Sequence, residues 1–186
     1  MKPNQSIAVA LATTLLALGL NAGASNAPES ITPGADESLL LRASATGVQI
    51  YECRASGDKD PQHAWVFVAP EAQLFDRQQR AIGSHGAGPV WEAKDGSRVV
   101  GAVKQRASAP RAGAIPWLLL STSAQGPQGL FSRVSSIQRI DTVGGIAPAA
   151  AGCTPATAGS IARVPYTADY LFYTAPRKDA RLSSAY

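Results

Sequence analysis

The sequence predicts an all-β fold, a single-domain antiparallel β-sandwich or barrel with long Gly/Pro-rich loops. Three observations support this class. The 186 residues are 45% hydrophobic and only 16% charged, and they include 17 Gly and 13 Pro, a composition that favours many turns over long surface helices. Short runs of β-forming residues recur between turn signals. The chain shows neither coiled-coil heptads nor the alternation of strands and helices typical of a parallel sheet.

The amino-terminal residues 1–27 have the three-part pattern of a secretory signal peptide. Lys2 precedes an apolar run over residues 7–20, and small residues follow it. The run is too short to span a bilayer, which takes roughly 20 apolar residues, so we expect no integral membrane span in the mature chain. The pattern predicts export to the periplasm or the cell exterior, a single β domain over residues 28–175, and a flexible tail over residues 176–186.

The first half of the domain contains several predicted extended segments. Residues 37–42 fit either one helical turn or an edge strand. Residues 47–54 alternate apolar and polar side chains, which indicates a strand. Residues 63–69 are nearly continuous in apolar character and predict a central strand. We expect a turn at residues 70–72, because Pro70 begins it, and a short extended piece at residues 73–76.

A hairpin follows in the middle of the chain. Residues 81–85 can be extended, and residues 86–89, rich in glycine, form a flexible corner. Asp95-Gly96 then lies between two extended runs, residues 90–93 and 98–103. Because Gly accepts the positive φ of a tight turn, this arrangement predicts a β-hairpin.

The second half of the chain is less regular. Residues 115–120 predict a core strand that Pro116 can only begin, since proline lacks the N–H that a sheet ladder requires. Residues 130–142 predict another extended segment with poor alternation, part of which could be a helical turn. Residues 143–159 have no periodicity and predict a loop. Residues 164–173, rich in tyrosine, predict the last strand.

The only two cysteines, Cys53 and Cys153, predict a disulfide. An exported protein folds in an oxidising compartment, where two thiols pair by default. A metal or redox role would require a CxxC pair or a cluster with histidine, and neither is present in the sequence.

The residues most suited to a site lie between Ala81 and Gly101. His85, Gly86, Gly88 and Trp91 are the candidate ligand-binding residues, because a histidine and an indole flank a flexible glycine corner there. The aromatic side chains could line a cleft for flat ligands or could fill the core; they are Trp65, Trp91, Trp117, Tyr51, Tyr166, Tyr170 and Tyr173.

The same segment offers a catalytic alternative. His85 with Glu92 or Asp95 could supply a general acid and base if the fold brought them into one cleft. The residues from His85 to Gly88 resemble an oxyanion loop of lipases, but the GxSxG nucleophile motif is absent from the sequence. Each of these residues also has a purely structural interpretation: His85 as a surface or turn histidine, Glu92 as a solvent-facing strand residue and Asp95 as a turn former.

Other classes of function lack a matching pattern. His63 and His85 are the only histidines, and no metal-ligand spacing accompanies them, so we expect no metal and no cofactor. The net charge of +4 comes from scattered basic residues rather than a basic run. Because nucleic-acid binders concentrate Lys and Arg on one face, we expect no nucleic-acid partner.

Several sequence blocks, in this order along the chain, resemble an exported family catalogued as domain of unknown function number 3455, with bacterial and fungal members. The blocks are residues 47–53, 82–92, 95–97, 115–120, 136–139, 142–145, 152–153 and 164–173. The resemblance implies export and the two-cysteine framework, and it implies no particular activity or catalytic residue.

We therefore predict a non-enzymatic exported β domain that binds a small molecule or an envelope glycan through the loops around residues 85–91. Two alternatives remain open at this stage. One is a small secreted hydrolase that uses His85 with Glu92 or Asp95. The other is a structural or stress-protective envelope protein without a defined ligand.

Overall fold

A computed structural model of the chain describes residues 27–56 and 62–176. Residues 1–26 of the predicted signal peptide and residues 177–186 of the predicted tail lie outside this part. The three helices within it are 3-10 turns of three residues each, η1 (Glu29–Ile31), η2 (Ala150–Gly152) and η3 (Pro155–Thr157). No helix of the described residues is long and apolar enough to cross a membrane.

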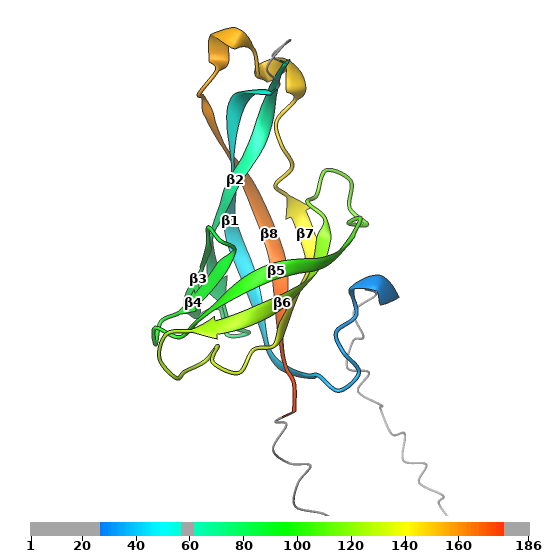
Figure 1. Cartoon of the computed structure of the whole chain (residues 1–186), viewed down its shortest axis with the longest axis vertical. Coiled ribbons are helices and arrows are strands. Elements are labelled where there is room, and N and C mark those ends of the chain that lie inside the picture. Colours follow the sequence, from blue (N-terminus) through cyan, green and yellow to red (C-terminus); the bar gives the residue numbers. More distant parts are fainter. Residues whose placement is uncertain (1–26, 57–61, 177–186) are drawn as a thin grey trace, which may run out of the picture.

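Eight antiparallel strands form one sheet that closes on itself, so the predicted all-β class is confirmed (Figure 1). Neighbours in sequence are neighbours in the sheet, and β8 pairs with β1 to complete the ring. The result is a barrel of irregular outline rather than two stacked sheets. The strands are β1 (Ser38–Ser56), β2 (Gln62–Phe75), β3 (Ala81–Gly86), β4 (Val90–Ala93), β5 (Arg98–Ala107), β6 (Trp117–Gln125), β7 (Ser136–Gly144) and β8 (Ile161–Thr174).

The strands β1, β2 and β8 are much longer than the rest and continue past the ring as a projection, with η2 and η3 at its end (Figure 1). Cys53 near the end of β1 is bonded to Cys153 beside η2, which confirms the predicted disulfide. Two backbone hydrogen bonds, Cys53 N to Ser160 O and Gly159 N to Cys53 O, hold the same loop. The bond therefore ties the η2–η3 loop to the β1 strand.

The side chains of β8 show how the ring builds its core. Tyr166, Ala168, Tyr170 and Phe172 follow every second position and are all buried inside the ring, as the two-residue period of a strand requires. Phe172 stacks on Phe131 with 4.7 Å between ring centroids. Tyr170 of this row also lines the pocket described below.

A second apolar cluster lies on the outer face of the ring. Ile31 of η1 is fully buried against Leu119, Ile140 and Leu171 from β6, β7 and β8. The Gln138 side chain donates a hydrogen bond of 2.8 Å to the Ile31 carbonyl. The segment before β1 thus covers apolar side chains that alternate outward from the ring.

The predicted turn at residues 70–72 is wrong, because β2 runs through Pro70 without interruption. Pro70 pairs with Gln49 of β1, and β2 meets β3 only from Ala72 onward. The residues before that point form an edge where the absent N–H of proline costs no ladder bond. For the same reason, residues 63–69 are an edge and not the predicted central strand.

The other predicted elements agree more closely with the structure. Residues 37–42, left open between a helical turn and an edge strand, enter β1 at Ser38. The β4–β5 hairpin is confirmed, and Gly96 in its turn has a φ of 82°. In the segment 130–142, residues 130–133 form turns and only the part from Ser136 onward is strand.

Candidate functional site

The ring holds a pocket of about 620 Å³, a volume ordinary for small-molecule sites. Most of its wall is aromatic or aliphatic. The lining residues are Gln49, Tyr51, Phe67, Val68, Pro70, His85, Gly88, Pro89, Trp91, Val103, Arg106, Ile115, Pro116, Leu118, Leu120, Arg139 and Tyr170.

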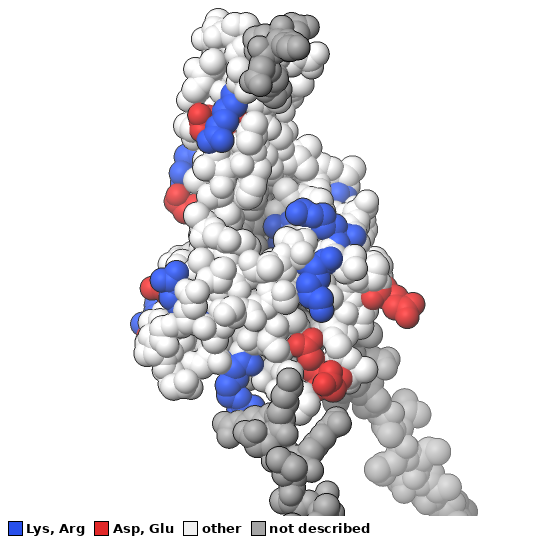
Figure 2. Space-filling model, in the orientation of Figure 1, with Lys and Arg blue, Asp and Glu red and all other residues white. Residues whose placement is uncertain are grey.

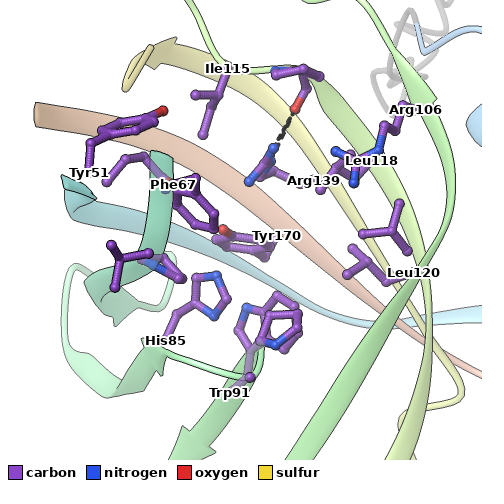
Figure 3. Close-up of a pocket in the computed structure, with 17 residues that line it drawn as sticks. Tyr51, Phe67, His85, Trp91, Arg106, Ile115, Leu118, Leu120, Arg139 and Tyr170 are labelled. Atoms are coloured by element: carbon purple, nitrogen blue, oxygen red, sulfur yellow. Dashed lines mark hydrogen bonds between the residues drawn. The ribbon is translucent and has the colours of Figure 1, made fainter. Parts of the chain in front are cut away.

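Closure of the ring assembles this wall from strands far apart in sequence. Tyr51 and Tyr170 come from the two long neighbours β1 and β8, and Leu120 comes from β6. Figure 3 shows Tyr51, Phe67, His85 and Tyr170 on one side of the pocket and Leu118 and Leu120 on the other. No single stretch of the chain contains the site.

The floor of the pocket is an aromatic group of three rings. His85 and Trp91 are cross-strand partners on β3 and β4, and their rings stack with centroids 4.2 Å apart and planes 10° apart. Tyr170 meets His85 edge-on at 5.2 Å. A Cβ on Gly101 would lie 2.8 Å from the Trp91 indole, so the glycine leaves the space that the indole occupies.

His85 is held in one protonation and tautomeric state. Its Nδ1 lies 2.9 Å from the Val90 carbonyl oxygen; because that oxygen only accepts, Nδ1 carries the ring proton and Nε2 is an acceptor. Burial is the main cause that lowers the pKa of His85 to about 3; the Val90 hydrogen bond opposes this lowering, and the positive charge of Arg139 adds a smaller lowering of its own. The imidazole is therefore neutral at any physiological pH.

Arg139 is a charged residue on the inner face of the ring. It pairs with Leu118 of β6 and Tyr170 of β8, both of which are buried in the interior. Its guanidinium donates through Nε at 3.1 Å and Nη2 at 2.7 Å to the Pro116 carbonyl, the contact drawn dashed in Figure 3. These two bonds orient the guanidinium, which also interacts with the Tyr170 hydroxyl. Because the group has five N–H donors, some stay available for a further acceptor.

Two more polar side chains lie in the wall. The Tyr51 hydroxyl donates a hydrogen bond of 2.7 Å to the Gly145 carbonyl, and burial raises the pKa of Tyr51. Gln49 is 3% exposed, and its Nε2 has no hydrogen-bond partner among the described residues. A buried amide donor without a partner costs about 1–3 kcal/mol, so Gln49 marks a polar point in an otherwise apolar wall.

The mouth of the pocket is apolar and exposed. Phe67, Val68 and Val103 line it and are 49%, 45% and 40% exposed. Arg106 lies beside them on β5. Figure 2 shows a group of Lys and Arg side chains over the middle of this face, beside a hollow. The entrance is therefore ringed by apolar side chains with positive charge at its edge.

Only some of the predicted site residues line the pocket. His85, Gly88 and Trp91 line the pocket, whereas Gly86 is not among its described lining residues. Glu92 follows the inward Trp91 on β4 and is exposed on the outer face, as strand alternation requires. Asp95 accepts hydrogen bonds from Ser97 N and Oγ and from Leu130 N, and these bonds lower its pKa.

The structure therefore does not bring His85, Glu92 and Asp95 into one cleft. Asp95 holds the hairpin turn against the loop after β6, which is a structural task. Among residues 27–56 and 62–176, no group of three His, Cys, Asp or Glu side chains could hold a metal ion.

The sequence prediction missed Arg139 and Gln49. The signal for Arg139 was its spacing of two from Ile137, which places both on one face of a strand. The turn residues that precede β7 disturb the alternation and hide this spacing. The signal for Gln49 was its place two residues before Tyr51 in the predicted first strand.

Comparison with known proteins gives a family and no activity. No curated protein and no solved structure matches the chain. The family described as Protein of unknown function (DUF3455) matches residues 33–174. This range includes all eight strands. The chain therefore belongs to this family of unknown function, DUF3455.

Proposed function

We propose that the chain is an exported β domain that binds a small, largely apolar molecule inside the ring. The observation that carries this proposal is the pocket of about 620 Å³ with an aromatic floor and an apolar, exposed mouth. Concave apolar sites with a few convergent polar groups are the usual form of small-molecule sites. The amino-terminal segment 1–27 and the disulfide support the exported location.

The lining favours a small molecule over an envelope glycan. A sugar chain presents many hydroxyl groups, and each needs a hydrogen-bond partner when it is buried. The described lining offers few such groups, chiefly His85, Gln49, Tyr51 and the two arginines, among many more apolar side chains. A ligand with an apolar body matches this wall better.

A neutral fluorescent probe tests the proposal directly. N-phenyl-1-naphthylamine fluoresces strongly only in apolar surroundings, and we expect it to bind the full chain with one-to-one stoichiometry. The substitution Val103→Trp should narrow the mouth and weaken binding at least tenfold. Val103 is a suitable position because it lines the pocket yet is 40% exposed, so a larger side chain there leaves the core packing in place.

The neighbouring Ala102→Trp is the matched control, since Ala102 is exposed on the same strand and is not among the described lining residues. It should bind the probe with the wild-type affinity. Absence of saturable binding by the wild-type chain would contradict the proposal and favour a structural role without a ligand. Equal weakening by both tryptophans would place the probe elsewhere.

A further inference from the structure

We propose that the natural ligand of this pocket is an organic anion, whose oxyanion pairs with Arg139 while its aromatic or other apolar body rests on the His85–Trp91 floor. This inference rests on the proposed function and specifies its ligand class. Three observations lead to it: the charge of the lining, the remaining donor capacity of Arg139, and the buried amide donor of Gln49.

The lining carries positive charge without compensation. Arg106 and Arg139 both line the pocket, and none of the described lining residues is Asp or Glu. The ion pairs among the described residues involve Arg42, Arg54, Arg80 and Arg163 and neither pocket arginine. Arg139 is half-buried and Arg106 is exposed. A positive charge without a carboxylate partner in a largely apolar lining favours a ligand that carries the opposite charge.

Arg139 is also oriented in advance for such a partner. Its two bonds to the Pro116 carbonyl fix one edge of the guanidinium. The group has five N–H donors in a planar fork, so the remaining edge can bind two oxygens of a carboxylate or a sulfonate. Figure 3 shows Arg139 between Ile115 and Tyr170, among the side chains that line the pocket.

The neighbouring polar groups fit the same ligand. Gln49 supplies a buried amide donor that lies near the Tyr166 hydroxyl without forming a hydrogen bond of normal geometry, and an anion oxygen can accept from it. His85 is neutral, so it adds no positive charge, and its stacked ring offers a flat apolar surface. Arg106 at the mouth gives an entering anion a second positive charge.

A matched pair of probes separates this inference from the proposed function. The anion 8-anilinonaphthalene-1-sulfonate has the same rings as N-phenyl-1-naphthylamine plus one sulfonate. We expect the full chain to bind the anion at least tenfold more tightly than the neutral probe. Arg139→Gln should weaken the anion about 10- to 100-fold, the size of one charge-assisted contact, and should change the affinity for the neutral probe less than twofold.

Two further variants control for a general effect of removing positive charge and for a folding defect of Arg139→Gln. Arg163→Gln removes an exposed arginine of β8 that pairs with Glu71, and it should alter neither affinity. Arg106→Gln, at the exposed mouth, should weaken the anion several-fold and reduce the salt dependence of its binding. This variant keeps the test decisive if circular dichroism shows that Arg139→Gln does not fold.

The outcomes are distinct. Equal affinities for the two probes, or equal weakening of both by Arg139→Gln in a folded variant, would overturn the anion inference and leave the proposed function intact. Failure of both probes to bind would remove the proposed function itself. Selective loss of anion binding in Arg139→Gln and Arg106→Gln, with Arg163→Gln unchanged, supports the inference.

Discussion

Replacing Cys53 and Cys153 together with serine is expected to lower the free energy of unfolding by about 4 kcal/mol. The two residues are 100 positions apart, and a cross-link over so long a loop strongly restricts the unfolded chain in the chain-entropy description. The native state also loses the bond that ties the η2–η3 loop to β1. Urea denaturation of the wild-type and double-serine chains measures the difference.

Reductant provides the control for this comparison. The wild-type chain with excess dithiothreitol should approach the stability of the double-serine chain, and the double-serine chain should not respond to dithiothreitol. A loss below about 1 kcal/mol in both comparisons would mean that the bond only fixes the end of the projection and leaves the ring unaffected.

Acidification from pH 7.5 to pH 5 is expected to reduce the free energy of unfolding by about 2 kcal/mol through His85 alone. The pKa of His85 is about 3 in the folded chain and near 6.5 when the ring is exposed to solvent. Between these values the unfolded chain binds a proton that the folded chain does not. Stability from this group is therefore complete above pH 6.5 and falls by up to about 1.4 kcal/mol per pH unit below it.

Urea denaturation at several pH values between 7.5 and 5 measures this slope. His85→Phe keeps an aromatic ring beside Trp91, and His85→Gln keeps a donor for the Val90 carbonyl; neither side chain titrates. Both variants should show a shallower dependence on pH than the wild-type chain. Parallel curves for all three chains would contradict the buried, neutral state of His85.

The sequence was sufficient for features that depend on local or pairwise chemistry. Turn residues and strand periodicity predicted the all-β class and the hairpin around Gly96. Two cysteines in a chain with a predicted signal peptide predicted their bond. The turn predicted at Pro70 was wrong, because a strand can contain proline wherever no neighbouring strand needs the N–H that proline lacks. At Pro70 only β1 pairs with β2. That pairing is a property of the sheet and not of the residue.

The candidate site was predictable only in part, for a similar physical reason. His85 and Trp91 stand six residues apart and meet through local β3–β4 pairing. Arg139 lines the same pocket because the sheet closes through the pairing of β8 with β1, and this closure directs one face of β7 toward the interior of the ring. Neither the closure nor the inward face could be deduced from residues 130–142, where turns precede the strand.

The central claim, that the ring pocket is the ligand site, is tested most directly by the three tryptophan indole N–H signals in an ¹H–¹⁵N NMR spectrum of the full chain. Trp91 lines the pocket, Trp117 belongs to the outer cluster and Trp65 lies near Gly152 at the projection. Trp91→Phe identifies the Trp91 signal by its loss. On titration with N-phenyl-1-naphthylamine, we expect a saturable shift of the Trp91 signal while the Trp65 and Trp117 signals stay in place. An unchanged Trp91 signal, or equal shifts of all three signals, would show that the probe does not bind in the ring pocket.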